Sequence, residues 1–200
     1  MKKFFALVMA ALMMMSMLAA CGGNTGPEDP KTIRIGLTGP LSGNNAVYGK
    51  AVEAGMKIAV EEVNAKGGLQ FEFKAEDDVS DNEIAGNAYN SLKDWEMDIF
   101  AGAVTSGPCN VIAPLAVEDQ IFMMTPSGSN EDIVKAGDSV FQMCYTDPNQ
   151  GAASAELIKA RMPDAVIGVI YDSSTDYSTG VYKSFMNKAK ELNLNVVEDA

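Results

Sequence analysis

The stretch from Ile33 to Gly68, IRIGLTGPLSGNNAVYGKAVEAGMKIAVEEVNAKGG, indicates the fold of this chain. Residues 33–38 are mostly aliphatic or β-branched and precede a Gly-Pro pair, which is typical of a strand followed by a turn. A loop rich in Gly, Ser and Asn then runs to Tyr48 and Gly49, and about four turns of helix follow it. A strand, a glycine-rich loop and a helix in this order form the first half of a βαβ unit.

One face of this predicted helix is apolar. The residues on it are Val52, Met56, Ala59, Val60 and Val63. Apolar residues at this spacing favour a helix that packs on a sheet, and Gly67 and Gly68 supply the left-handed stop that ends it. Ligands of open α/β sheets bind beyond the carboxyl ends of the strands. The loop 39–49 is therefore the first candidate for a binding site.

The same alternation continues along the chain. Strands are predicted at 69–73, 98–102, 121–125, 141–145, 165–171 and 196–197, and helices from Ser80 with a capping box to Glu83, from Pro108, at 150–162 and at 180–192. Pro114 should kink or delay the helix that begins at Pro108. Alternating strands and helices predict an α/β fold with parallel, doubly wound sheets. The strand at 165–171, AVIGVIY, is continuously apolar, which favours a buried central position.

The pattern breaks at residues 146–149 and then restarts. This break divides the chain into a first α/β lobe at 32–146 and the beginning of a second at 147–200. Roughly 55 residues are too few for a complete α/β domain of ordinary size. We therefore expect the second lobe to be incomplete in this chain.

The amino terminus resembles an export signal. Lys2 and Lys3 precede an apolar run at 4–20 that ends in small residues, so residues 1–20 are predicted to be a signal peptide, with a permanent membrane anchor as the alternative. Leu18-Ala19-Ala20-Cys21 resembles the bacterial lipobox, which implies cleavage before Cys21 and lipid on its sulfur. Residues 21–31, with few apolar side chains, are predicted to be a flexible tether.

Composition excludes several classes of function. The 200 residues carry 15 basic and 27 acidic side chains, a net charge of −12, with no run of Lys and Arg, so no nucleic-acid partner is expected. The absence of histidine excludes Ser-His-Asp and Cys-His catalysis and His-based metal sites within this sequence. Cys109 and Cys144 leave a disulfide open. The acidic residues around Asp78 lack the spacing of a calcium loop and are interpreted as a solvated turn and a helix start.

An ordered set of motifs gives a resemblance to a known family. The motifs are IRIGLTGPLSG with YG, VNAKGG, AEDD, the Thr-Ser-Gly loop, MMTPSGS and VIYDSSTDYSTG. Together they resemble the extracytoplasmic solute-binding proteins of branched-chain amino acid ABC transporters, over residues 32–200. These are type I periplasmic binding proteins with two Rossmann-like lobes. The resemblance implies a small amino-acid-like ligand held between the lobes, delivery to membrane permease subunits, a lipid-anchored position outside the cytoplasm, and neither an enzymatic reaction nor a cofactor.

The resemblance also implies a set of ligand contacts. Tyr48 would cover the ligand from the first lobe, and Tyr177 would close from the second. Ser106 would bind the ligand carboxylate, which a helix N-terminus favours independently. Ser127 would offer its carbonyl, and Ser129 its hydroxyl, to the ammonium group. The acidic partner of that ammonium would fall beyond residue 200.

Two features of this sequence depart from the family pattern, and three other interpretations of its residues or its function remain open. Many members have Ala and Thr where this chain has Ser127 and Ser129, and the cysteines that often pair in the family fall at Ser80 and Thr105, so a strict leucine, isoleucine or valine specificity does not follow. Serines in βα loops also serve as caps and turn formers without binding anything. The alternative functions are a sensing receptor domain of the same fold and an exported enzyme with Cys109 as nucleophile. The ligand itself is not determined by the sequence.

Overall fold

The computed structural model describes residues 32–199. The predicted signal peptide at 1–20, the lipidation site Cys21 and the tether at 21–31 lie outside the described residues. Within the described part, no helix has both the length and the apolar character needed to cross a membrane.

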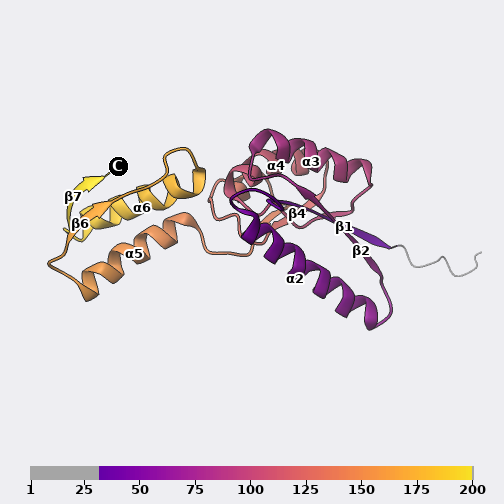
Figure 1. Ribbon diagram of the computed structural model, residues 1–200, viewed down its shortest axis with the longest axis horizontal. Helices are drawn as coiled ribbons and strands as arrows, with labels where there is room; N and C mark the ends of the chain where they lie inside the picture. Colours follow the sequence, from indigo (N-terminus) through magenta and orange to yellow (C-terminus); the bar gives the residue numbers. More distant parts are fainter. Residues whose placement is uncertain (1–31, 200) are drawn as a thin grey trace, which may run out of the picture. The chain divides into compact units, whose positions relative to one another are not determined.

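Five parallel strands form the first sheet, in the order β2-β1-β3-β4-β5 (Figure 1). The strands are β1 (Ile33–Gly39), β2 (Phe71–Asp77), β3 (Ile99–Phe100), β4 (Phe122–Thr125) and β5 (Val140–Gln142). The chain runs outward from β1 to β2 and then returns to the other side of β1 to build β3, β4 and β5. The order therefore reverses between β1 and β3, the kind of switch point at which doubly wound sheets bind ligands.

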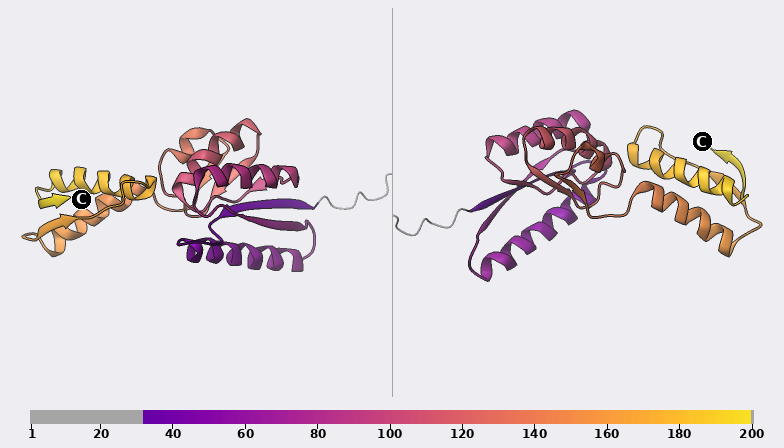
Figure 2. Two further views of the ribbon diagram at one scale, coloured as in Figure 1. Left: turned by 45° about the horizontal axis from the view of Figure 1, so that its top comes forward. Right: turned by 180° about the vertical axis from the view of Figure 1, so that it is seen from behind.

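Helices cover both faces of this sheet. Helix α2 (Ala46–Ala65) lies on one face, whereas α3 (Asn82–Asp94) and α4 (Ser106–Glu118) lie on the other, as Figure 2 shows. A short 3-10 helix, η1 (Ile133–Ala136), follows β4. The predicted α/β class with a parallel, doubly wound sheet is confirmed for this part of the chain.

The main core lies between the first sheet and helices α3 and α4. Tyr89 of α3 meets Phe100 of β3 edge to face, with ring centroids 5.3 Å apart, and both side chains are fully buried. The α2 side is less enclosed. The predicted apolar face of α2 is only half-buried at its best-covered positions, and Ala59 and Val63 on that face are exposed. Gly49 is its one buried residue.

A second, two-stranded parallel sheet contains β6 (Val166–Val169) and β7 (Asn195–Asp199). Helices α5 (Asp147–Arg161) and α6 (Asp176–Glu191) lie side by side against it (Figure 1), and Phe185 is part of the small core that they share. The predicted buried central position of 165–171 is wrong for the described part of the chain. Only one face of β6 is covered there, so Val166 is 66% exposed and Ile170 is 91% exposed.

All five helix starts differ from the sequence prediction, and the two of the second sheet are early: α5 begins at Asp147 and not at 150, and α6 begins at Asp176 and not at 180. Helix α2 begins at Ala46, so Tyr48 lies in its first turn and not in the preceding loop. The cap of α3 is Asp81, whose carboxylate accepts the N–H groups of Glu83 and Ile84, whereas Ser80 is in the left-handed region at φ 61°. Helix α4 begins at Ser106, and Pro114 lies inside it without ending it. Burial of one face of α4 outweighs the local preference of proline.

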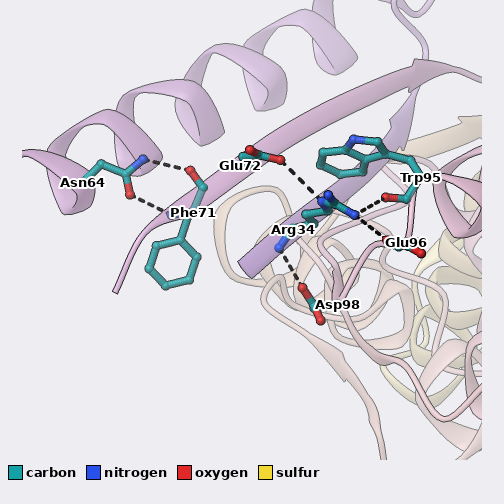
Figure 3. Close-up of polar contacts among 7 residues, drawn as sticks. All are labelled: Arg34, Asn64, Phe71, Glu72, Trp95, Glu96 and Asp98. Carbon is teal, nitrogen blue, oxygen red and sulfur yellow. Dashed lines mark hydrogen bonds and ion pairs between the residues drawn. The ribbon is translucent and has the colours of Figure 1, made fainter. Parts of the chain in front are cut away.

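The amino end of the first sheet is held by Arg34, the second residue of β1 (Figure 3). Its guanidinium donates to Glu96 at 2.9 Å and to the carbonyl of Trp95 at 3.1 Å, lies over the indole ring of Trp95, and pairs with Glu72 at 3.5 Å. Its backbone N–H donates to Asp98 at 3.0 Å. One side chain of β1 thus joins β2 to the segment that leads into β3, at the end of the sheet opposite the switch-point loops.

The connection from α2 to β2 is closed by a reciprocal pair of hydrogen bonds (Figure 3). The amide of Asn64 donates to the carbonyl of Phe71 at 2.8 Å and accepts its N–H at 2.9 Å. Between these residues, Gly67 and Gly68 have φ values of 75° and 85°, which confirms the predicted left-handed stop.

Candidate functional site

The carboxyl ends of β3 and β4 are joined through Ser106, the first residue of α4. Its side chain is buried, and its hydroxyl oxygen accepts the backbone N–H groups of Ser129 at 3.2 Å and Asn130 at 3.3 Å. Because the oxygen accepts both bonds, the hydroxyl proton stays available to a further acceptor. The N–H groups in the first turn of a helix have no acceptor within the helix. The structure therefore places a hydroxyl donor and a helix N-terminus together beside the switch point.

The loop after β4 is fixed by two further hydroxyl groups. Ser127 donates its hydroxyl to the carbonyl of Val104 at 2.6 Å, so this hydroxyl is already in use. Thr125 donates to the carbonyl of Ala103 at 2.7 Å and accepts the N–H of Gly128 at 2.8 Å. The structure thus brings Ser106, Ser127 and Ser129, three of the predicted contact residues, into one cluster of loops.

The acidic loop after β2 differs from its prediction. Asp81 caps α3 as expected of a helix start, but Asp78 is fully buried and not solvated. Its backbone N–H donates to the carbonyl of Gly39, one carboxylate oxygen accepts the N–H of Ser80 at 2.9 Å, and the other oxygen has no partner in the described residues. Burial raises the pKa of Asp78 to about 6, against the opposing effect of the Ser80 hydrogen bond. Asp78 therefore ties the β2 loop to the end of β1.

Asp147, the first residue of α5, was missed by the sequence analysis. Its backbone N–H donates to the carbonyl of Ser129 at 2.9 Å, and its side chain is 1% exposed. Neither carboxylate oxygen has a hydrogen-bond partner in the described residues. Burial raises the pKa of Asp147. The nearby hydroxyl of Ser129 acts in the opposite direction, although it makes no hydrogen bond to the carboxylate. An aspartate at a helix start is an ordinary cap in sequence, so no local signal marked it.

The two predicted tyrosines lie apart from the serine cluster. Tyr48 is 62% exposed on the first turn of α2, and Tyr177 is 45% exposed on the first turn of α6. The hydroxyl of Tyr177 exchanges hydrogen bonds with the side-chain amide of Gln150, at 2.9 and 3.2 Å. No hydrogen bond or ring contact within residues 32–199 connects either tyrosine to Ser106, Ser127 or Ser129.

The thiol of Cys109 is enclosed at the start of α4. It is fully buried and donates to the carbonyl of Ala103 at 3.2 Å, and burial raises its pKa to about 12. A thiol of this kind has almost no thiolate near neutral pH, so it is a poor nucleophile. Cys144 is partly exposed, and both thiols are free. The disulfide that the sequence left open is not formed.

A polar hollow of about 640 Å³ lies between the loop after β4, α4 and one face of α6. Asn110 of α4 and Asp176 of α6 meet at its edge, where the amide donates to the carboxylate at 2.9 Å. Asp147 also lines it, whereas none of the five predicted contact residues does. In the described part of the chain, no group of three or more Cys, Asp or Glu side chains is placed to hold a metal ion.

Residues 32–200 match the family model described as periplasmic binding protein. The chain belongs to the periplasmic binding protein family. It is 29% identical over 163 residues to "Leu/Ile/Val-binding protein homolog 3" of Brucella melitensis, a match that covers 78% of this chain and 44% of that protein. This periplasmic binding protein chain thus spans less than half the length of that relative.

Solved structures show the same fold. The branched-chain amino acid transporter substrate binding protein of Streptococcus pneumoniae, in complex with isoleucine, superposes with a TM-score of 0.77 at 28% identity, over 84% of this chain and 49% of that one. A solute binding protein from Rhodopseudomonas palustris in complex with 4-hydroxybenzoate has a TM-score of 0.76 at 21% identity, over 85% of this chain and 46% of that one. The fold is therefore the type I periplasmic binding protein fold, and these two solved structures of that fold hold different carboxylates.

Proposed function

We propose that the whole protein is an extracytoplasmic solute-binding protein that captures a small amino-acid-like ligand and delivers it to the permease subunits of an ABC transporter. The family and the names of the relatives support this function. The observation that carries it in this chain is the cluster at the switch point, where Ser106 and the N-terminus of α4 offer donors to an anion.

In this proposal the ligand carboxylate lies at the first turn of α4. The hydroxyl and N–H of Ser106 donate to it, while the carbonyl of Ser127 and the hydroxyl of Ser129 face the ammonium group. Tyr48 and Tyr177 approach only when the ligand is enclosed. Their exposed positions, apart from the serines, suit side chains that change their surroundings on closure.

The proposed closure requires two lobes, the first at 32–146 and the second beginning at 147. The separate five-stranded and two-stranded sheets support this division. No covalent bond is made or broken in the proposed function. The enzymatic alternative needs Cys109 as a nucleophile, a role for which its buried, protonated thiol is unsuited.

A thermal-shift screen of the full-length protein tests this function. The panel contains the twenty common L-amino acids, their simple amides, and 4-hydroxybenzoate as an aromatic carboxylate. A ligand present at 100 times its dissociation constant should stabilise the protein by about 2.7 kcal/mol. A protein that responds to none of these compounds at millimolar concentration would contradict the proposal.

We further propose that lipid on Cys21 holds the protein at the outer face of a membrane. The sequence Leu18-Ala19-Ala20-Cys21 supports this. Cys21→Ala should release the protein into the soluble fraction or leave it unprocessed, with Cys144→Ala as the matched control. Unchanged membrane fractionation with normal processing of the Cys21→Ala protein would contradict the lipid anchor.

A further inference from the structure

Asp77, the last residue of β2, holds the loop that follows β1. One of its carboxylate oxygens accepts the backbone N–H of Leu41 at 2.7 Å, and the other accepts the hydroxyl of Ser42 at 2.5 Å. Partial burial alone would raise the pKa of Asp77, but these donors outweigh it and hold the pKa below its ordinary value of 3.8. The carboxylate is therefore ionised at neutral pH, and its hydrogen bonds are charge-assisted.

A second contact joins the same two loops at the other end of residues 40–45. The side-chain amide of Asn45 donates to the hydroxyl of Ser80 at 3.1 Å. The carbonyl of Asn45 accepts the backbone N–H of Tyr48 at 3.0 Å, in the first turn of α2. The loop 40–45 is thus attached to the loop after β2 near each of its ends, and the second attachment is bonded directly to Tyr48.

The first turn of α2 lies against the beginning of this loop. A Cβ atom placed on Gly49 would come within 2.0 Å of the carbonyl oxygen of Pro40, so the two backbones are in direct contact. The side chain of Tyr48, the residue before Gly49, is 62% exposed and has no hydrogen bond or ring contact within residues 32–199. Its place is therefore set by the backbone of the loop and of the first turn of α2.

The loop after β2 keeps a strained backbone beside these contacts. Val79 has a φ of 44° and Ser80 a φ of 61°, a left-handed conformation that a β-branched residue such as valine rarely adopts. The N–H of Val79 donates to Asp77 at 3.0 Å, and the N–H of Ser80 donates to the buried Asp78 at 2.9 Å. Strain of this kind persists where the surrounding contacts determine it, and it is common at functional sites.

We propose that Asp77 is a positioning residue of the solute site, which fixes the loop 40–45 and through it presents Tyr48 to the ligand. This inference rests on the proposed function, in which Tyr48 covers the ligand. Asp77 does not contact the ligand itself, because both of its carboxylate oxygens already accept donors of the protein.

The test uses the full-length protein and isothermal titration. The twenty common L-amino acids and 4-hydroxybenzoate are titrated first, and the compound that binds most tightly is the probe. Tyr48→Ala should weaken binding of the probe roughly 2- to 10-fold, because an aromatic contact is lost. Asp77→Ala should weaken it by a similar factor. The double variant should bind no more weakly than either single variant, because both changes remove the same contact.

Two further variants separate positioning from stability. Asp77→Asn keeps an oxygen for the N–H of Leu41, and its NH₂ group can donate to the hydroxyl oxygen of Ser42, so it should restore most of the affinity. Asp119→Ala is the matched control, because it also removes a carboxylate that accepts two side-chain donors. Asp119 follows the last residue of α4, at the opposite edge of the sheet. Its loss should lower the unfolding temperature and leave the affinity unchanged.

Three results would overturn the inference and leave solute capture intact. They are full affinity in Asp77→Ala, full affinity in Tyr48→Ala, and single losses that multiply in the double variant. If Asp77→Ala does not fold, Ser42→Ala removes one of the same bonds and replaces it in the comparison. Its smaller loss of affinity should disappear in a Tyr48→Ala background, and full affinity in Ser42→Ala would overturn the inference. A full-length protein that binds none of the compounds overturns the inference together with the proposed function.

Discussion

The hydroxyl oxygen of Ser106 accepts the backbone N–H of Ser129 at 3.2 Å, so one side chain joins the first turn of α4 to the loop after β4. The same oxygen also accepts the N–H of Asn130. Ser106 thus holds the loop after β4 against the first turn of α4, and in the proposed function it also faces the ligand. A serine that only capped its own helix would bond to the first turn of α4 and not to another loop.

Ser106→Ala should therefore lower both stability and affinity. Removing the oxygen leaves two N–H groups without their acceptor, and each unpaired buried group costs about 1–3 kcal/mol. Urea unfolding and titration with the same amino acid measure the two effects. Ser91→Ala, which removes a single hydroxyl bond to Glu76 away from the proposed ligand contacts, is the matched control. If Ser106→Ala loses stability but keeps its affinity, the serine is structural and the carboxylate assignment is wrong.

Two glycines of α2 should respond oppositely to alanine. At Gly49 a Cβ would lie 2.0 Å from the carbonyl oxygen of Pro40, which is backbone and cannot move aside cheaply. Overpacking of this kind costs about 1–3 kcal/mol or more. At Gly55 nothing lies within 4 Å, so alanine should stabilise the helix by about 0.5–1 kcal/mol. Thermal unfolding of both variants checks the pair. Equal effects would show that α2 does not approach Pro40 as the structure has it.

Asp78→Asn should remove part of the pH dependence of stability. Burial raises the pKa of Asp78 from its ordinary value of 3.8 to about 6, so between these values the folded state holds a proton that the unfolded state has released. Stability from this group therefore falls as pH rises through 6 and is restored as pH falls toward 4. Asparagine has no such charge. Relative to the unaltered protein, Asp78→Asn should therefore gain stability between pH 4 and pH 8, by on the order of 3 kcal/mol. A difference independent of pH would show that Asp78 titrates normally.

Cys109 should resist alkylation in the native protein. The thiol is fully buried, and its pKa of about 12 leaves almost no thiolate at pH 8. In a Cys21→Ala, Cys144→Ala background, iodoacetamide should label Cys109 only at denaturant concentrations that unfold the protein. A Cys21→Ala, Cys109→Ala protein gives the matched rate for the partly exposed Cys144. Rapid native labelling of Cys109 would favour the exported-enzyme alternative.

The sequence alone determined the order of the strands and helices and the end of the sheet at which a binding site is expected. Apolar periodicity and the turn residues predicted β1, the helix after it and the stop at Gly67 and Gly68, because these depend on residues close together in the chain. The resemblance to the family implied that the serines of the loops after β3 and β4 contact one ligand, and the geometry of a parallel sheet agrees with their coming together. Carboxyl ends of parallel strands always meet at one edge of a sheet.

Only the tertiary structure decided what each of these polar groups does. Asp78 and Asp147 are ordinary aspartates in sequence, and they become buried because strands and helices distant in the chain close over them. Gly180 stands 33 residues after Asp147 and lies against its carboxylate, a contact that no local pattern records. Charge, burial and the absence of a partner are properties of three-dimensional surroundings, so these two buried carboxylates became visible only after folding.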